Sequence, residues 1–452
     1  MHGSNDQGAA VQGAGDSSYA RPVLADRHPD APQQKDLDKC VHCGLCLNSC
    51  PTYRELGIEM DSPRGRIYQM VQVATGAAPV SSEQYLEHLG LCLGCRGCET
   101  ACPSGVQYGR LIEAARTEIQ AKIPLSPMAQ LLQWFVFKQL LQSPLLLKIV
   151  GLKLWIYQQS GLQRLVRASG ILKLMGALGR AEKLAPEAEM PTFYGSIGKV
   201  FPAEGPRKHK VAFMAGCMAN IFFARLNEAT VRVLQKNGCE VHIPADQGCC
   251  GALHAHAGLR DEARKLARQN IDAVLDGGFD AILTNAGGCG STLKEYGELL
   301  EHDAAYHAKG ERWVSLMRDV NEFLASIELN RDMGEVKLTV TYQDSCHLAH
   351  GQKVRSAPRQ LLRSVPGLTL KEMASSDVCC GSAGIYNVVQ NEMSMQILES
   401  KMRNVNATGA QAIATANPGC LLQVKAGAEL YGHGQKAYHV IEILDQAYRN
   451  RK

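Results

Sequence analysis

The sequence predicts a mixed fold, in which a small α-helical domain precedes a duplicated pair of α/β domains. Two cysteine runs with the same spacing lie between Cys40 and Pro103 of the 452 residues. A different set of cysteines occurs twice after residue 208, where short apolar runs alternate with longer stretches of helical character. The cysteines in both parts are also the candidate functional residues.

The first cysteine run extends from Cys40 to Pro51 (C-V-H-C-G-L-C-L-N-S-C-P) and the second from Cys92 to Pro103 (C-L-G-C-R-G-C-E-T-A-C-P). Both follow the spacing C-x2-C-x2-C-x3-C-P, in which three thiolates bind one iron–sulfur cube and the fourth reaches a neighbouring cube. The runs therefore predict a ferredoxin-like domain with two [4Fe–4S] clusters and a role in electron transfer. Forty-one residues separate Cys50 from Cys92, so helices are expected to bridge the two runs.

The same geometry predicts how the eight thiolates are shared, because the fourth cysteine of each run points away from the other three. The first cluster is expected on Cys40, Cys43, Cys46 and Cys102, and the second on Cys92, Cys95, Cys98 and Cys50. Arg64, Arg66 and Arg96 are expected near the clusters, where positive charge would stabilise the reduced, more negative state.

Two other cysteine chemistries fit less well. Structural zinc sites usually join two C-x2-C pairs across a loop, and a tetrahedral site needs neither three evenly spaced cysteines nor the C-P ending. For a disulfide scaffold, 17 cysteines in 452 residues is a low density, and no apolar secretory segment precedes them. We therefore expect iron–sulfur chemistry in a reducing compartment, the cytoplasm.

Composition limits the remaining classes of function. A hydrophobic content of 45% in a chain of this length predicts two or three domains, and a formal net charge of +4 gives no reason to expect nucleic acid as a partner. Residues 1–34 are rich in Gly, Ala, Gln, Asp and Ser, which predicts a disordered arm rather than a targeting peptide.

The stretch between Glu118 and Glu182 contains no acidic residue, while lysines and arginines interrupt apolar runs such as L-L-Q-W-F-V-F. Its longest uncharged part, Ile123 to Phe137, has 15 residues, which is short of the roughly 20 needed to span a bilayer. We expect no membrane span, and two interpretations stay open. The helices dock on an anionic membrane surface or a partner subunit, or they pack on the chain's own domains.

A set of cysteines recurs in the second half of the chain. Cys217, the pair Cys249-Cys250 and Cys289 correspond to Cys346, the pair Cys379-Cys380 and Cys420, at offsets of 129, 130 and 131 residues. Glycine follows each pair, and A-I-L-T-N-A-G-G-C corresponds to A-I-A-T-A-N-P-G-C. The alternation of β-rich and helical stretches predicts parallel α/β sheets with all eight cysteines at the carboxyl ends of their strands.

These eight cysteines predict a candidate third redox centre, built from the lone cysteine, the Cys-Cys pair and the later cysteine of each half. The candidates are Cys217, Cys249, Cys250, Cys289, Cys346, Cys379, Cys380 and Cys420. The alternative is that they are buried small apolar groups. Cys239 has no counterpart and is expected in the core. Ligand or proton-relay roles are open for five nearby histidines, with a structural role the simpler expectation: His254, His256, His347, His350 and His439.

The predicted domain boundaries follow from these patterns. They are 1–34 (disordered arm), 35–120 (two-cluster ferredoxin-like domain), 121–205 (basic, apolar helical segment for docking or a membrane surface), 206–335 (first Cys-Cys-Gly domain) and 336–452 (second Cys-Cys-Gly domain).

With these motifs the chain resembles the iron–sulfur subunits of bacterial glycolate oxidase (glycolate dehydrogenase), within the wider set of heterodisulfide-reductase-like proteins. The resemblance extends from about Asp36 to the C-terminus. It is carried by C-V-H-C-G-L-C, D-S-P-R-G-R-I, C-E-T-A-C-P-S-G-V, G-C-C-G-A, G-C-G-S-T-L-K-E-Y-G, V-C-C-G-S-A-G-I-Y and T-A-N-P-G-C.

The resemblance implies the electron-transfer subunit of a glycolate (2-hydroxy acid) dehydrogenase complex in glyoxylate metabolism. FAD-binding partner subunits would take a hydride from the substrate, and this subunit would pass single electrons toward a quinone or another membrane acceptor. It would be a cytoplasmic oxidoreductase subunit without catalytic residues of its own, peripheral on the inner face of the cell membrane. In agreement, the sequence has no glycine-rich nucleotide-binding motif between a predicted strand and a predicted helix.

The chain departs from the heterodisulfide reductases at the last cysteine of each Cys-Cys-Gly unit. In those enzymes that cysteine is the first of a C-x-x-C pair. In this chain the position of the second cysteine is occupied by Thr292 in one half and by Gln423 in the other. Two [4Fe–4S] clusters are therefore expected. Whether the two halves share a further cluster stays open.

Three alternative functions also stay open. The first is the iron–sulfur subunit of a related lactate or glycerol-3-phosphate dehydrogenase. The second is a thiol–disulfide oxidoreductase that uses the pairs Cys249-Cys250 and Cys379-Cys380. The third is a scaffold organised by zinc, without redox function.

Overall fold

The computed structural model describes residues 27–176, 179, 182 and 185–451. Most of the predicted disordered arm, residues 1–26, lies outside this description. The rest of it packs against the body of the molecule. Arg27 forms an ion pair with Glu118 at 2.6 Å, and Asp30 forms one with Arg264 at 2.5 Å.

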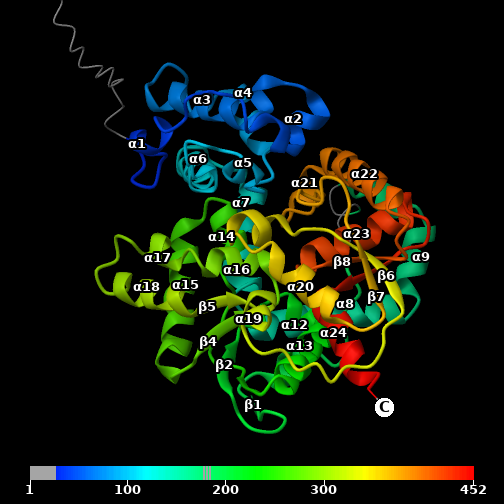
Figure 1. Cartoon of the computed structure of the whole chain (residues 1–452). Coiled ribbons are helices and arrows are strands. Elements are labelled where there is room, and N and C mark those ends of the chain that lie inside the picture. The colour runs from blue at the N-terminus through cyan, green and yellow to red at the C-terminus, as the bar shows by residue number, and fades with distance from the viewer. Residues whose placement is uncertain (1–26, 177–178, 180–181, 183–184, 452) are drawn as a thin grey trace, which may run out of the picture.

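The N-terminal domain is helical and lies above the α/β domains in Figure 1. Its elements are α1 (Gln34–Leu37), η1 (Leu47–Ser49), α2 (Pro51–Leu56), η2 (Glu59–Asp61), α3 (Pro63–Ala74), α4 (Glu83–Gly90), α5 (Gly97–Thr100) and α6 (Tyr108–Lys122). Proline begins α2 and α3, where its missing N–H has no helical partner to lose. Helices α3 and α4 bridge the two cysteine runs, as the sequence predicts, and pack with α6 around Met70, Leu89 and Leu111.

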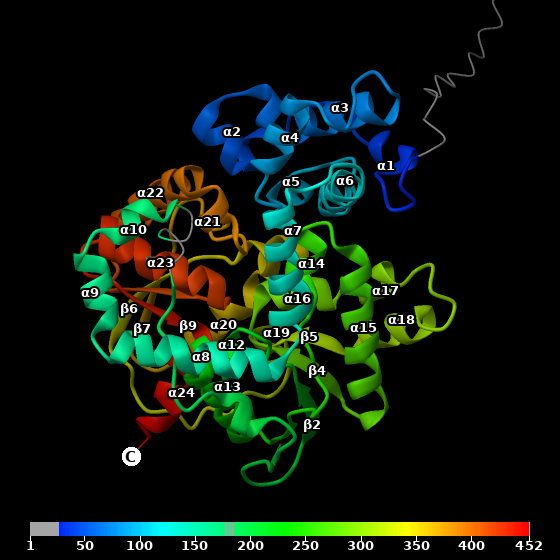
Figure 2. The same cartoon turned by 180° about the vertical axis from the view of Figure 1, so that it is seen from behind.

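A chain of short helices follows and crosses the back of the α/β domains (Figure 2). It consists of α7 (Pro127–Gln133), the π-helical η3 (Trp134–Leu140), α8 (Pro144–Gln159), α9 (Leu162–Ala168) and α10 (Ile171–Leu174). Within the described ranges, no single helix is long and apolar enough to cross a membrane. The pair Pro127–Leu140 and Pro144–Gln159, which is bent by 106°, reaches that length and composition when the two are taken together.

The second half contains two sheets with the same strand order, which confirms the predicted duplication. In the first sheet, β3 (Cys239–His242), β2 (His209–Phe213), β4 (Ala281–Thr284) and β5 (Met317–Asp319) lie parallel in this order. A short β1 (Val200–Phe201) adds an antiparallel edge beside β3. In the second sheet, β7 (Leu368–Lys371), β6 (Leu338–Tyr342), β8 (Ala412–Thr415) and β9 (Lys436–His439) are all parallel.

Helices cover both sheets, in the arrangement expected for parallel strands. Those of the first half are α12 (Ala219–Phe222), α13 (Ala224–Lys236), α14 (Ala252–His256), α15 (Arg260–Val274), α16 (Gly287–Leu293), α17 (Tyr296–Leu299), α18 (His307–Leu316) and α19 (Val320–Ser326). Those of the second half are η6 (His347–Gly351), α20 (Ser356–Ser364), α21 (Tyr386–Val389), α22 (Asn391–Ala407), α23 (Pro418–Tyr431) and α24 (Val440–Arg449). Two more short 3-10 helices are η4 (Phe193–Ser196) and η5 (Leu275–Gly277).

The two halves share one hydrophobic core, which includes Phe213 and Leu283 of the first half and Tyr342 and Leu444 of the second. Helix α13 packs on α24 across this junction, and α19 packs on α20. At the rim of the junction, Arg232 binds both carboxylate oxygens of Asp445 at 2.8 and 2.9 Å.

The candidate cysteines lie after the carboxyl ends of the strands, as predicted for parallel sheets. Cys217 follows β2, and Cys346 follows β6. Each Cys-Cys pair is followed by a glycine in the left-handed region, with φ of 84° at Gly251 and 89° at Gly381. This conformation suits glycine and turns the chain sharply after each pair.

The packing of α6 on the first α/β domain can be tested at Gly258, which has φ of 79°. A Cβ atom there would lie 2.5 Å from the backbone oxygen of Arg116 in α6. Gly278, with φ of 63° and open space around it, provides a control that shares the backbone strain but not the contact. Gly258→Ala should reduce the free energy of unfolding by about 1–3 kcal/mol more than Gly278→Ala. Equal melting temperatures of the two variants would contradict this packing.

Candidate metal centres

Four thiols of the N-terminal domain line one small cavity: Cys40, Cys43, Cys46 and Cys102. The loop curls around the cavity because His42 and Gly44 both have positive φ, of 54° and 84°. Arg64 also lines the cavity and donates from Nη1 to the carbonyl oxygen of His42 at 3.0 Å. Cys43 is exposed, so this cavity lies at the surface of the molecule.

The other four thiols of the two runs line a second small cavity: Cys50, Cys92, Cys95 and Cys98. Three of these four cysteines, Cys50, Cys92 and Cys98, are buried. The Cys50 Sγ atom lies 3.2 Å from the Thr52 hydroxyl and 3.8 Å from Nη1 of Arg66. Cys92 Sγ accepts from the backbone N–H of Gly94 at 3.4 Å.

The arrangement of these thiols fits an iron–sulfur cube. Each of the two cavities is surrounded by four sulfurs and by backbone or guanidinium donors. A tetrahedral zinc site would bring its sulfurs to about 3.8 Å from one another, given a Zn–S bond of about 2.3 Å. In the part of the chain that the structure describes, no three His, Cys, Asp or Glu side chains converge closely enough for a single metal ion. The donor set thus suits a larger, multi-atom group.

Arg66 is the buried cation of the second cavity, with 1% of its surface exposed. Burial alone would lower its pKa, but the nearby Cys92, Cys50 and Asp61 groups raise it above the ordinary arginine value. The guanidinium contacts Asp61 at 3.2 Å and donates to the carbonyl oxygen of His88 at 2.7 Å. A fixed positive charge therefore lies beside the sulfurs.

The quartet of the second half adjoins the second cavity. Cys346 Sγ lies 3.9 Å from Cys379 Sγ, and both pack with Cys95 and Leu93 of the N-terminal domain. Burial raises the pKa of Cys95 well above its ordinary value, and the neighbouring Cys379 thiol raises it further. Cys380 and Cys420 lie deeper in the same half, where the Cys379 thiol and burial raise the pKa of Cys380 to about 12.

The quartet of the first half lies on the opposite side, beneath the helical segment. Cys217 Sγ is 3.5 Å from Cys249 Sγ, and Cys250 and Cys289 complete the group in one apolar cluster. Cys217 also packs on the cluster that joins Leu147 of α8 to Ile221 of α12. The Cys249 thiol and burial raise the pKa of Cys217 well above its ordinary value.

The two Cys-Cys-Gly quartets lie in different apolar clusters, with Asn417 between them. Its amide donates to Cys420 Sγ at 3.4 Å, and its oxygen accepts from the backbone N–H of Gly288, next to Cys289, at 3.0 Å. None of the thiol–thiol contacts described above joins one half to the other.

The five histidines make structural contacts to groups other than thiols. His439 begins α24 with its Nδ1 accepting from the backbone N–H of Ile441, and burial lowers its pKa to about 4. His254 and His347 bond to the carbonyl oxygens of Phe137 and Gly94, and His350 to that of Asp377. His256 pairs with Glu113 at 2.7 Å. His350 also bonds to the Thr100 hydroxyl and His439 to the carbonyl oxygen of Asn285, so all five tie one domain or segment to another.

Cys239 lies in β3 with no exposed surface, as expected for a core residue, and burial raises its pKa to about 12.

Sequence reasoning missed several polar residues that support the cysteines. Lys401 of α22 is 2% exposed and donates to the carbonyl oxygens of Ser375 and Ser376, just before the Cys379-Cys380 pair. At the matching place in the first half, Asn270 of α15 donates to the carbonyl oxygen of Cys249 at 2.9 Å. The 131-residue offset between Cys289 and Cys420 also relates Asn270 to Lys401. This pair of supporting residues could therefore have been found from the repeat.

Family models match four stretches of the chain. A "4Fe-4S dicluster domain" matches residues 36–106, and a "Cysteine-rich domain" matches residues 211–294 and 340–425. A model described as "Glycolate oxidase iron-sulfur subunit, linker region" matches residues 128–185. The matches agree with the predicted order of one cluster domain and two Cys-Cys-Gly domains.

Curated relatives match most of the chain. It is 43% identical to a "Probable glycolate oxidase iron-sulfur subunit" of Bacillus subtilis (strain 168), covering 91% of this chain and 94% of that protein. It is 33% identical to the "Glycolate oxidase iron-sulfur subunit" of Escherichia coli (strain K12), with the same coverage. "Lactate utilization protein A" of Shouchella clausii (strain KSM-K16) is 31% identical, over 52% of this chain and 98% of that protein.

The buried Arg66 and the more exposed Arg64 allow a matched test of the two cavities. Arg66→Met would leave the Asp61 carboxylate buried without its guanidinium, at a cost of about 3–5 kcal/mol. Arg64→Gln breaks an ion pair with Glu59 near the surface, which should cost less than about 1 kcal/mol. Thermal unfolding of anaerobically prepared protein should therefore show a much lower melting temperature for Arg66→Met. Similar melting temperatures would contradict the buried position of Arg66.

Proposed function

The chain belongs to the family of glycolate oxidase iron–sulfur subunits, and we propose that it relays electrons from an FAD-bearing partner subunit toward a membrane quinone. It is the electron-transfer component of an oxidoreductase. The observation that carries the proposal is the presence of two thiol quartets, each around one cavity and one of them beside a third quartet.

We assign one [4Fe–4S] cluster to Cys40, Cys43, Cys46 and Cys102, and another to Cys92, Cys95, Cys98 and Cys50. Each set lines one cavity, and Cys50 and Cys102 each line the cavity of the other run. When bound, such clusters accept and return single electrons. The chain's own groups hold the sulfurs, exclude water from the second cavity and place the positive charges of Arg64 and Arg66 beside them.

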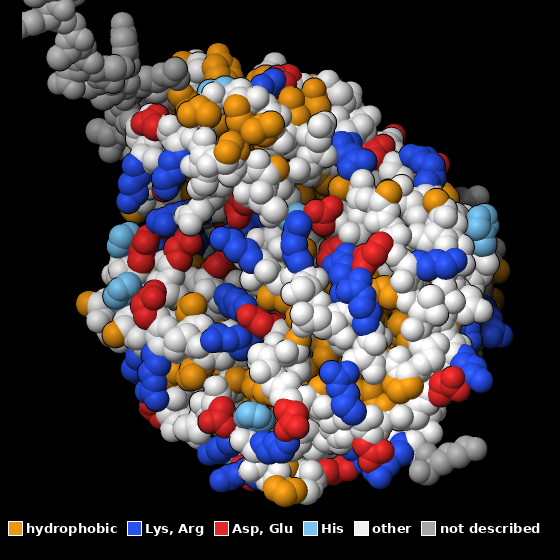
Figure 3. All heavy atoms as spheres, in the orientation of Figure 1, with side chains coloured by type: hydrophobic (Ala, Val, Ile, Leu, Met, Phe, Trp, Pro, Cys, Tyr) orange, Lys and Arg blue, Asp and Glu red, His pale blue; other side chains and the backbone are white. Residues whose placement is uncertain are grey.

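The exposed side of the first cavity favours electron uptake there. Val41, Leu45 and Ile58 are 67%, 61% and 46% exposed, and Figure 3 shows apolar side chains gathered over this N-terminal end. Exposed apolar side chains around a redox site suit a protein partner. That partner must convert the two-electron oxidation of a 2-hydroxy acid into single-electron steps, which is chemistry that a flavin provides.

The positions of the thiols support a relay through the molecule. Cys46 and Cys50 lie on either side of η1, and Cys95 packs against Cys346 and Cys379. Asn417 then connects Cys420 with the backbone beside Cys289. A further cluster in the Cys-Cys-Gly domains would extend the relay, and we propose their eight cysteines as its ligands. The acceptor would lie at the inner face of the cell membrane, with the chain peripheral to it.

Burial argues against a thiol–disulfide oxidoreductase. Cys249 and Cys250 are 3% and 6% exposed, and Cys379 and Cys380 are 2% and 1% exposed. Burial also contributes to raising the pKa of each of these thiols, which disfavours the nucleophilic thiolate. A disulfide substrate would thus meet neither an open path nor a reactive sulfur.

Metal analysis of the anaerobically purified full chain tests this function. Two clusters should give about eight irons and eight acid-labile sulfides per chain, and a further cubane cluster about twelve of each. Low-temperature EPR of the reduced protein should show [4Fe–4S]⁺ signals. Zinc without sulfide would overturn the proposal in favour of a structural scaffold.

If each run supplies its fourth cysteine to the cluster of the other run, single substitutions should give a distinct pattern of EPR signals. Cys50→Ala and Cys95→Ala should leave the same residual EPR signal, since both would remove the second cluster. Cys102→Ala and Cys43→Ala should share the complementary residual signal. The core variant Cys239→Ala should keep both signals and serves as the control. If Cys50→Ala instead matched Cys43→Ala, the assignment of the fourth ligands would be wrong.

A further inference from the structure

We propose that helices α7 to α10 form a face that lies flat on an anionic lipid bilayer. This inference deepens the proposed function, and rests on it in part, because it names the surface by which the subunit would meet the membrane. We call residues 128–175 the lipid face. Four observations carry it: exposure, charge, shape and packing.

The lipid face concentrates the exposed apolar side chains of the molecule. Of the 26 large hydrophobic residues that are exposed among the described residues, 15 lie between Met128 and Met175. They are Met128, Leu131, Leu132, Trp134, Phe135, Leu145, Ile149, Val150, Leu152, Ile156, Leu162, Leu165, Ile171, Leu174 and Met175. A soluble surface rarely exposes so many contiguous apolar groups without a binding partner.

Helix α8 is apolar on both its inner and outer sides. Its inner side buries Leu147 and Gly151 against the protein, while its outer side exposes Leu145, Ile149 and Ile156. A helix at a water-exposed surface normally presents polar residues outward. The outer side of α8 therefore requires an apolar environment that the described chain does not supply.

The charge of the lipid face is of one sign, since no acidic residue lies between Glu118 and Glu182. Two of its basic groups pair with carboxylates at its border: Lys138 with Glu262, and Arg167 with Glu182. Lys148, Lys153 and Arg164 are exposed, and the structure gives them no acidic partner within its described ranges. These cations complement anionic headgroups.

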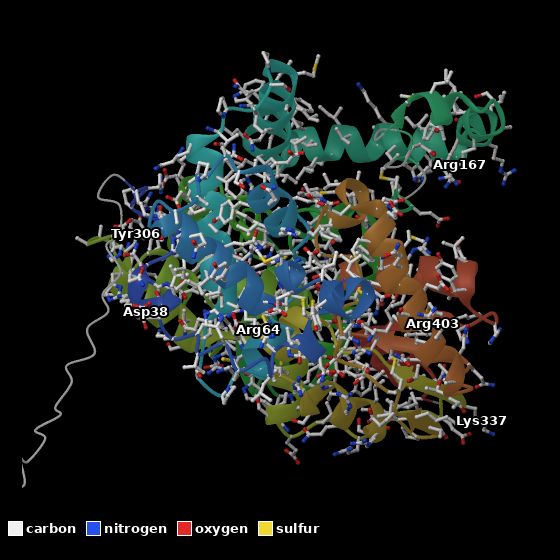
Figure 4. All side chains as sticks on the ribbon, turned by 90° about the horizontal axis from the view of Figure 1, so that it is seen from above. Asp38, Arg64, Arg167, Tyr306, Lys337 and Arg403 are labelled. Carbon is white, nitrogen blue, oxygen red and sulfur yellow. The ribbon has the colours of Figure 1, made fainter. Side chains whose placement is uncertain are left out.

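The shape of the lipid face also fits a bilayer surface. Figure 4 shows these helices as the outermost layer on one side of the molecule, with Arg167 near their end and Arg64 among the N-terminal helices in the middle of the view. The 106° bend between the two long parts turns them along the surface, and neither part alone is long enough to span. Apolar helices with lysines and interfacial aromatics such as Trp134 and Phe135 are typical of segments that lie in the headgroup region.

A protein partner is the main competing occupant, and composition disfavours it. Lysine is depleted at protein–protein interfaces, whereas lysines are spread along the whole lipid face. Long lysine side chains can instead extend from an apolar helix to the headgroups. Residues 1–26 of this chain are mostly small and polar, which makes them a poor cover for fifteen large apolar groups.

The lipid face lies directly over the first-half quartet. A Cβ atom on Gly151 of α8 would be 2.8 Å from Ile221 of α12, which begins two residues after Cys217. Leu147, Ile221 and Cys217 pack in one apolar cluster. On a bilayer, this quartet would therefore be separated from lipid by one helix.

Vesicle co-sedimentation of the anaerobically prepared full chain tests the proposal. The chain should sediment with vesicles that contain phosphatidylglycerol and far less with pure phosphatidylcholine, and added salt should weaken binding. Lys153→Gln with Arg164→Gln should lower the partition constant roughly 10- to 30-fold, if each cation contributes about as expected for a juxtamembrane charge. The control Lys337→Gln with Arg403→Gln removes two exposed cations elsewhere (Figure 4) and should bind as the unchanged chain does.

A second set of variants separates apolar insertion from attraction by charge. Leu131→Gln, Leu145→Gln and Leu165→Gln together should abolish binding, whereas Val200→Gln, Val389→Gln and Leu430→Gln, at exposed apolar sites elsewhere, should not. Iron content and EPR signals should be unchanged in both triple variants, so a failure of the lipid face is distinguishable from a failure of the relay. A chain that stays in solution with anionic vesicles would overturn the proposal. So would a lipid-face variant that binds vesicles normally but no longer binds the partner subunits.

Discussion

The structure depends on keeping groups of sulfur atoms together, most of them buried or half-buried, where negative charge is costly. Burial contributes to raising the pKa of one thiol in each quartet, Cys40, Cys95, Cys217 and Cys380, so isolated thiolates would be unstable there. Hydrogen-bond donors and cations at fixed positions offset this cost. Arg66 lies beside Cys50, Gly94 donates to Cys92, and Lys401 lies behind the Cys379-Cys380 turn. Arg66 and Lys401 come from helices α3 and α22 rather than from the cysteine turns themselves, so these helices have to be in place around the sulfurs.

The two duplicated halves place their cysteines in the same way but in different surroundings. Both place a lone cysteine after the first parallel strand, and in both a polar residue of the second helix after the Cys-Cys-Gly turn donates to backbone at or just before that turn. That residue is the neutral Asn270 in the first half and the basic Lys401 in the second. The second half faces the N-terminal domain through Tyr386, whose hydroxyl donates to the carbonyl oxygen of Leu91, and the first half faces α8. Duplication thus produced two similar sites that face opposite neighbours.

Much of the fold could be predicted from the sequence, because local patterns carry it. Strand–helix alternation and the cysteine offsets predict two similar parallel sheets, and the 41-residue gap predicts helices between the runs. Other features depend on contacts between distant segments. Neither the antiparallel β1, nor the anchoring of residues 27–33 by Arg27, nor the role of Asn417 leaves a local pattern. The histidines show the limit most clearly, since His439 near the cysteines in sequence proves to be a helix cap.

The single core that spans both halves has a mechanical consequence. Phe213 and Tyr342 belong to the same buried cluster, and Arg232 clamps Asp445 across the junction. A hinge opening between the halves would expose this core to water, at a large cost in free energy. The two sulfur groups of the halves are therefore held as parts of one rigid frame. Any gating of electron flow by domain motion must take place where partners dock, outside this junction.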